Sequence, residues 1–93
     1  MLSKIPFNLE GLNKEEKDRQ ILRIGMMAEL DAVSLYEQLA ASTDSQDLKA
    51  VLLDIAKEEK THIGEFQALL LKIDKEQVEE LKNGEEEAGE LTE

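Results

Sequence analysis

A glutamate and a histidine stand three residues apart at Glu59 and His62, inside a helix-forming run from about Leu48 to Ile73. Residues with this spacing lie about one turn apart on the same side of a helix, so their carboxylate and imidazole groups can reach one metal ion. Both occupy the middle of a series in which apolar residues recur every three or four positions. The apolar members of the series are Leu48, Leu52, Ile55, Phe66, Leu69 and Ile73. An unpaired charge on such a packing stripe is costly, so the pattern predicts a metal-ligand pair.

The preceding helix-forming run carries a third candidate ligand, Glu29. Its apolar series has the same steps and consists of Leu22, Met26, Val33, Tyr36 and Ala40. Glu29 therefore faces inward, and an antiparallel pair of helices would bring it to the level of Glu59 and His62. Dinuclear carboxylate bundles use one Glu from each of two helices and a Glu-x-x-His from each of the other two. This chain supplies half of that set, and a two-fold dimer would supply the whole.

Carboxylate and imidazole ligands without sulfur suit iron, manganese or zinc, and carboxylates that can bridge favour a dinuclear site. In the structural alternative, Glu59 and His62 hydrogen-bond to one another or to a core lysine, and Glu29 pairs with a basic residue of a partner. Tyr36, two turns beyond Glu29 on the same series, is either a hydrogen-bond donor or radical-quenching phenol near the metals, or a core aromatic. Glu58 and Glu65 flank the motif off the stripe and are interpreted as solvated.

These ligands require helices to position them, and the sequence predicts an all-α fold. Asn13 followed by Glu16 has the pattern of a capping box and predicts a first helix over about 14–41. Gly25 inside it costs about 1 kcal/mol relative to alanine, which is compatible with a close approach of another helix. Residues 1–12 are expected to form an irregular arm. Its apolar residues, which could pin it to a neighbour, are Ile5, Phe7, Leu9 and Leu12.

The connection after the first helix is a turn cluster over residues 42–45. Thr43 or Ser45 can cap a second helix that continues to about Lys72. So short a connection makes the two helices antiparallel neighbours.

A short third helix is predicted to start at Asp74, dock through Val78 and Leu81, and end in a left-handed cap at residues 83–84. The acidic tail over 85–93 is expected to be frayed or disordered.

The length and composition of the chain limit the kinds of protein that it can be. The chain has 93 residues, no cysteine and a net charge of −11, so we expect one helical domain over 1–84, with no disulfide or thiolate site. The charge argues against nucleic acid and anionic membranes as partners and favours attraction of cations. No run approaches the roughly 20 apolar residues that a membrane span needs, there is no signal-peptide pattern, and we expect a cytoplasmic protein. A hairpin of this size leaves a broad apolar face uncovered, so association is expected.

The residues over 28–37, 58–66 and 69–82 together resemble the encapsulated ferritin family, and the likeness covers about 20–84. The resemblance implies a two-helix protomer with a short third helix, which dimerises into a ferritin-like four-helix bundle. It also implies a di-iron ferroxidase centre at the dimer interface. Family members typically form a ring of five dimers, a decamer, and oxidise Fe(II) for storage within an encapsulin shell.

Carried over by position, the resemblance implies that Glu29, Glu59 and His62 are iron ligands and that Tyr36 is the nearby tyrosine. We therefore expect a ferroxidase that oxidises Fe(II) to Fe(III) and feeds iron mineralisation within an encapsulin nanocompartment. The alternatives are a rubrerythrin-like peroxidase, a manganese-binding bundle, and a non-catalytic helical oligomerisation module. The C-terminus shows no obvious hydrophobic shell-docking peptide, so we expect either a truncated chain or the ferritin-like part of a shell-fused protein.

Overall fold

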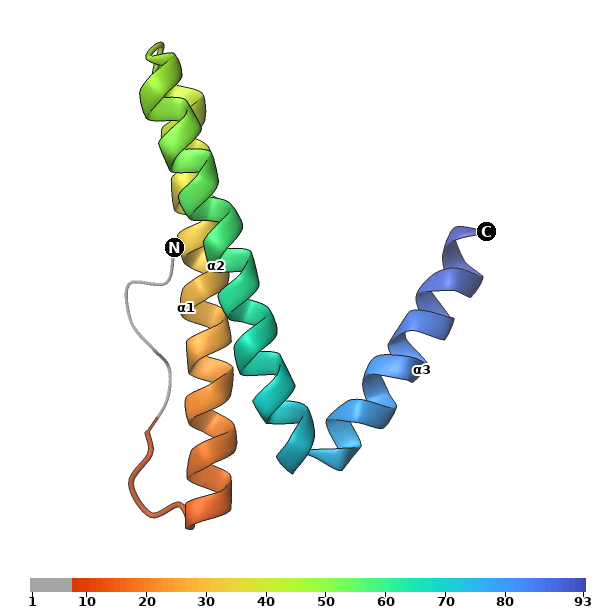
Figure 1. The fold of residues 1–93 in the computed structure, drawn as a ribbon. Helices are drawn as coiled ribbons and strands as arrows, with labels where there is room; N and C mark the ends of the chain where they lie inside the picture. The colour runs from red at the N-terminus through yellow and green to blue at the C-terminus, as the bar shows by residue number, and fades with distance from the viewer. Residues whose placement is uncertain (1–7) are drawn as a thin grey trace.

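The computed structural model describes residues 8–93, and this part of the chain contains three α-helices and no strand. Helix α1 spans Lys14–Ser42, α2 spans Gln46–Ile73 and α3 spans Lys75–Thr92. Helices α1 and α2 lie side by side as an antiparallel hairpin, and α3 leaves the far end of α2 at an open angle (Figure 1). The predicted all-α hairpin with a third helix is confirmed. The arm residues Ile5 and Phe7 lie outside the described part.

The two long helices begin at the predicted side-chain caps. The Asn13 side-chain oxygen accepts a hydrogen bond from the Glu16 backbone N–H at 2.9 Å, and the Asn13 amide donates to the Glu16 carboxylate at 3.1 Å. Of the two candidate caps for α2, Ser45 takes the position: its hydroxyl oxygen accepts from the Leu48 N–H at 3.1 Å. Thr43 instead holds the turn, since its hydroxyl oxygen accepts from the Ser45 N–H at 3.2 Å. Both helix starts are therefore satisfied locally.

Asp74 joins α2 to α3 and also ties this junction to α1. One carboxylate oxygen accepts the Gln77 N–H at 3.0 Å, which confirms Asp74 as the N-cap of α3. The other oxygen accepts from the Arg23 guanidinium at 3.0 Å, and the Asp74 N–H donates to the Leu70 carbonyl at 2.9 Å. Because Arg23 belongs to α1, this ion pair fastens the start of α3 to the hairpin. Val78 is half-buried, and Leu81 lines an apolar cleft of about 280 Å³ between the helices.

The predicted end of the third helix at Asn83 and Gly84 is wrong, because α3 continues to Thr92. Among the described residues only Gly11 has a positive φ, 80°, so Gly84 keeps helical backbone and forms no left-handed cap. Glutamate is a good helix former, and Asn83 donates its side-chain amide to Glu80 within the helix at 3.2 Å. The acidic segment after Gly84, expected to be frayed or disordered, is thus helical in the structure. The division into 1–84 and 85–93 stays a prediction.

The core of the hairpin is narrow. Its buried residues are Ala40, Ala56 and Leu70. Three predicted packing residues of α2, Leu48, Leu69 and Ile73, are exposed instead, which corrects the predicted stripe at its two ends. The apolar series is broader than the line along which α2 meets α1, so its outer members remain uncovered.

One row of residues along α2 is exposed at Leu48, Val51, Leu69 and Ile73 and half-buried at Ile55 and His62, and we call these six residues the open stripe. Steps of three, four and seven keep these residues on one face of a helix with 3.6 residues per turn. Val51 is 58% exposed and Leu69 52%. The expectation that a hairpin of this size leaves apolar surface uncovered is therefore confirmed. None of the helices described for residues 8–93 combines the length and apolar character needed to cross a bilayer.

Candidate metal centre

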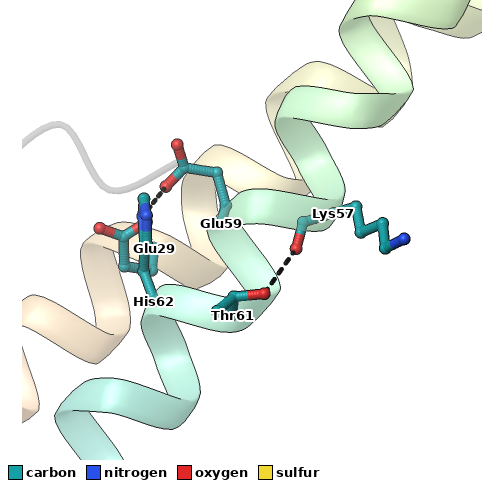
Figure 2. Close-up of polar contacts among 5 residues, drawn as sticks. All are labelled: Glu29, Lys57, Glu59, Thr61 and His62. Carbon is teal, nitrogen blue, oxygen red and sulfur yellow. Dashed lines mark hydrogen bonds and ion pairs between the residues drawn. The ribbon is translucent and has the colours of Figure 1, made fainter.

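Glu29, Glu59 and His62 meet at the middle of the hairpin. Figure 2 shows Glu29 reaching from α1 toward Glu59 and His62, which lie one turn apart on α2. One ligand atom from each residue can be chosen so that all three lie within 4.8 Å of one another. The sequence-predicted set of three is thus brought together by the fold.

The register of the hairpin explains this meeting. Glu29 lies fifteen residues before Asp44 in the turn, and Glu59 lies fifteen residues after it. Both helices rise by about 1.5 Å per residue, so residues equally far from the turn reach the same level. The short connection between Ser42 and Gln46 leaves little freedom for the helices to slide. Local capping and turn chemistry therefore place ligands that are thirty residues apart in the sequence.

The distances within the cluster suit ligands of one ion better than direct hydrogen bonds. His62 Nδ1 lies 3.4 Å from Glu29 Oε2 and 3.5 Å from Glu59 Oε2. Good N–H···O bonds are about 2.7–3.2 Å long, so both contacts are loose, and a single N–H cannot point at both oxygens. Two ligands held about 2.1 Å from one metal ion can be up to about 4.2 Å apart. His62 can therefore share an ion with either carboxylate.

Among the residues that the structure describes, no lysine or arginine pairs with the carboxylates of the cluster. Within residues 8–93, the ion pairs of Glu29 and Glu59 are both with His62. Lys60 pairs with Glu37 at 3.3 Å, and the Lys57 side chain points away from the cluster (Figure 2). Within the described residues, Glu59 therefore does not form the alternative contact with a core lysine. Two carboxylates and one imidazole suit a divalent cation such as iron, manganese or zinc.

Burial differs among the three side chains. Those of Glu29 and Glu59 are each 19% exposed, whereas that of His62 is 43% exposed. His62 also belongs to the open stripe, so the cluster opens onto uncovered apolar surface. Sheltered carboxylates strengthen the attraction for a cation, because less water screens them. The open side leaves room for ligands from outside this chain.

Tyr36 is half-buried on α1, seven residues after Glu29 and therefore about 10 Å farther along the helix axis. Among the described residues its hydroxyl has no hydrogen-bond partner. Its role near the metal stays a prediction. Met26 and Met27 line the cleft near Leu81 and serve packing. Glu58 and Glu65 are exposed.

Two contacts between the helices were not predicted from the sequence. The pairing of Arg23 with Asp74 joins residues 51 positions apart, and no local signal identifies it. The contact of Phe66 with Gly25 had a partial signal, since a glycine inside a helix indicates a close approach.

Comparison with known proteins places the chain in a family. The EncFtn-like family model matches residues 5–84. The chain belongs to the EncFtn-like family. A crystal structure of the encapsulated ferritin domain from Pyrococcus furiosus matches with a TM-score of 0.85 at 49% sequence identity. The match covers 99% of this chain and 96% of that one, so the fold of this EncFtn-like chain is that of an encapsulated ferritin domain.

Two relatives of this EncFtn-like chain carry names that refer to encapsulin. A ferritin-like–encapsulin shell fusion protein of Pyrococcus furiosus is 54% identical over 78 residues, which is 84% of this chain and 23% of that protein. The encapsulin nanocompartment cargo protein EncC of Myxococcus xanthus is 38% identical over 61 residues, 66% of this chain and 47% of that protein. The chain thus spans less than half the length of either relative.

Proposed function

We propose that this protein is a ferroxidase that oxidises Fe(II) to Fe(III) at a di-iron site formed between two copies of the chain. The observation that carries the proposal is the cluster of two sheltered carboxylates and one imidazole opening onto uncovered apolar surface. Membership of the EncFtn-like family supports iron as the metal. Fe(II) is here the substrate, and Glu29, Glu59 and His62 are the residues that bind it.

A second copy related by a two-fold axis would complete the site. Doubling the cluster yields four carboxylates and two imidazoles, the set that dinuclear carboxylate bundles use. The open stripe around His62 supplies apolar surface for such a contact, and two hairpins packed along it form a four-helix bundle. In a two-fold contact the same patch serves both copies, which requires the half-site to lie on the interface. His62, 43% exposed on the same face of α2 as Val51 and Leu69, meets this requirement.

The residues contribute binding and charge. Anionic oxygen ligands stabilise Fe(III) more strongly than Fe(II), because the ion of higher charge gains more from each carboxylate. Oxidation of two Fe(II) releases two electrons. Either O₂ takes them with two protons to give H₂O₂, or H₂O₂ takes them with two protons to give two molecules of water. Holding two ions side by side lets both electrons leave together.

We further propose that the oxidised iron is stored inside an encapsulin compartment. We also propose that five dimers assemble into a ring, a decamer. The names of the relatives, a shell fusion protein and an encapsulin cargo protein, support this compartment. A hairpin with a single narrow core has no cavity for mineral, so storage requires a separate container.

The direct test is aerobic addition of Fe(II) to metal-free protein, followed by near-ultraviolet absorbance of Fe(III). We expect oxidation faster than in protein-free buffer, with two iron ions bound per dimer. An oxidation rate equal to that of protein-free buffer would indicate that the chain is a non-catalytic oligomerisation module. Reaction with H₂O₂ but not with O₂ would indicate a peroxidase, and metal analysis showing manganese would indicate a manganese bundle.

Tyr36 offers a finer test of the surroundings of the site. Tyr36→Phe keeps the ring and removes the hydroxyl, which can lean back toward the preceding turn and the metals. We expect slower oxidation or altered transient absorbance in stopped-flow measurements, with the iron stoichiometry unchanged. If Tyr36→Phe behaves as wild type and Tyr36→Ala only weakens assembly, Tyr36 contributes packing alone.

A further inference from the structure

Phe66 of α2 lies directly against the backbone of α1 at Gly25. A Cβ atom at Gly25 would meet three ring carbons of Phe66, Cε1 and Cζ at 3.0 Å and Cε2 at 3.1 Å. The other glycines of the described residues behave differently: a Cβ at Gly11, Gly64, Gly84 or Gly89 would meet nothing within 4 Å. Among the described glycines, Gly25 is thus the one at which packing of another residue depends on the absence of a side chain.

This contact lies one turn away from the metal ligands on both helices. Gly25 precedes Glu29 by four residues, and Phe66 follows His62 by four. Four residues correspond to about 6 Å along a helix axis. Because a helix is stiff over one turn, the separation of α1 and α2 at Gly25 is transmitted to the ligand cluster.

The geometry of the cluster is sensitive to that separation. Glu29 is the ligand from α1, whereas Glu59 and His62 both come from α2, so moving the helices apart changes only the distances to Glu29. His62 Nδ1 lies 3.4 Å from Glu29 Oε2, and two ligands of one ion can be at most about 4.2 Å apart. The margin is therefore about 0.8 Å. A methyl group 3.0 Å from the ring is closer than ordinary van der Waals contact, so the Phe66 ring and the two helices must give by a few tenths of an ångström, which takes up part of this margin.

We infer that Gly25 and Phe66 form a spacer that sets the separation of α1 and α2 and thereby positions Glu29 against Glu59 and His62 for metal binding. The inference rests on the proposed function in one respect, that these three residues bind metal. Neither Gly25 nor Phe66 carries a metal-ligating side-chain atom. They act as positioning residues through the distance between the helices.

The test compares Co(II) binding to the full chain in wild type, Gly25→Ala, Phe66→Leu and the double variant Gly25→Ala/Phe66→Leu. We expect Gly25→Ala to lower the Co(II) affinity severalfold and to shift the visible Co(II) absorption bands. The double variant should recover at least half of the lost affinity, since leucine makes room for the added methyl. Gly84→Ala is the matched control, because it adds the same methyl where nothing lies within 4 Å. It should bind Co(II) as wild type does.

Unchanged Co(II) affinity and spectrum in a folded Gly25→Ala protein would overturn the inference while leaving the proposed function intact. Failure of the double variant to recover binding would also overturn it, because relief of the clash is its central claim. If Gly25→Ala does not fold, the Co(II) affinity and absorption spectrum of the double variant are compared with those of Phe66→Leu. Equal values would support the inference, and weaker binding by the double variant would overturn it. If wild type itself fails to bind Co(II), the proposed function and the inference fall together.

Discussion

We expect Glu59→Ala to reduce Fe(II) oxidation to the rate of protein-free buffer, and Glu29→Ala and His62→Ala to do the same. In a site shared by two copies, each substitution removes two ligands at once. The measurement is the initial rate of aerobic Fe(II) oxidation at fixed protein concentration, with the helix content checked by circular dichroism.

The matched controls are Glu58→Ala and Glu65→Ala, which remove exposed carboxylates next to the cluster without touching it. Both should retain nearly the wild-type rate, so that a loss at Glu59 reports ligation rather than net charge. A well-folded Glu59→Ala protein that oxidises iron at the wild-type rate would refute the ligand assignment.

Stability separates the role of the ligands in metal binding from any role in folding. Without metal the two carboxylates repel one another, so Glu59→Gln should leave the metal-free hairpin as stable as wild type or more stable. With metal at about a hundred times its Kd, wild type gains about 2.7 kcal/mol through preferential binding to the folded state. The variant should lose most of this gain. Thermal unfolding with and without Mn(II), which avoids oxidation, measures both quantities.

We expect oxidation per protomer to fall when the protein is diluted below the concentration at which it dimerises. In the proposed site each copy holds half of the ligands, so a monomer should bind iron weakly and lack the second metal position. Metal bound only by the dimer also stabilises the dimer by mass action. Fe(II) under anaerobic conditions should therefore shift the mass distribution toward even-numbered assemblies. A monomer that keeps its full specific rate across the dilution series would contradict the shared site.

The open stripe provides a variant that breaks assembly while sparing every ligand. Leu69→Lys places a charge on a residue that is 52% exposed and lies two turns from His62 on the same face of α2. Burying an unpaired lysine at an interface is costly, so the variant should be monomeric and should lose oxidation with Glu29, Glu59 and His62 intact. Leu91→Lys is the control, because Leu91 lies on α3 away from the stripe and is 86% exposed. An active dimer of Leu69→Lys would place the interface elsewhere.

The meeting of the three ligands could be predicted from the sequence because local signals determine it. The caps at Asn13 and Ser45 set where the two long helices begin. Equal rise along both helices then brings Glu29 opposite Glu59 once the turn is short. The identity of the metal and the role of Tyr36 are not determined in this way, since they depend on groups outside a single chain.

Which apolar residues of α2 pack against α1 could not be predicted from the sequence, because this depends on how the two helices face one another. Leu69 belongs to the same apolar series as Phe66, yet Phe66 packs against Gly25 and Leu69 is exposed. The apolar series covers a wider face of α2 than the contact with α1 does. Periodicity alone therefore cannot tell which of its residues contact α1 and which stay exposed in a single chain. The end of α3 was missed for a different reason. Gly84 is typical of a helix end, but the residues around it favour helix strongly enough to continue through it.

The sequence by itself determined the number of helices, their starts and the candidate metal ligands, because capping, periodicity and turn length act over a few residues. The tertiary structure alone decided the spacing of α1 and α2 at Gly25 and Phe66, and the ion pair of Arg23 with Asp74 that fastens α3. These contacts join residues 41 and 51 positions apart. They depend on the rotation of each helix about its own axis, and that rotation is settled only when whole surfaces pack together.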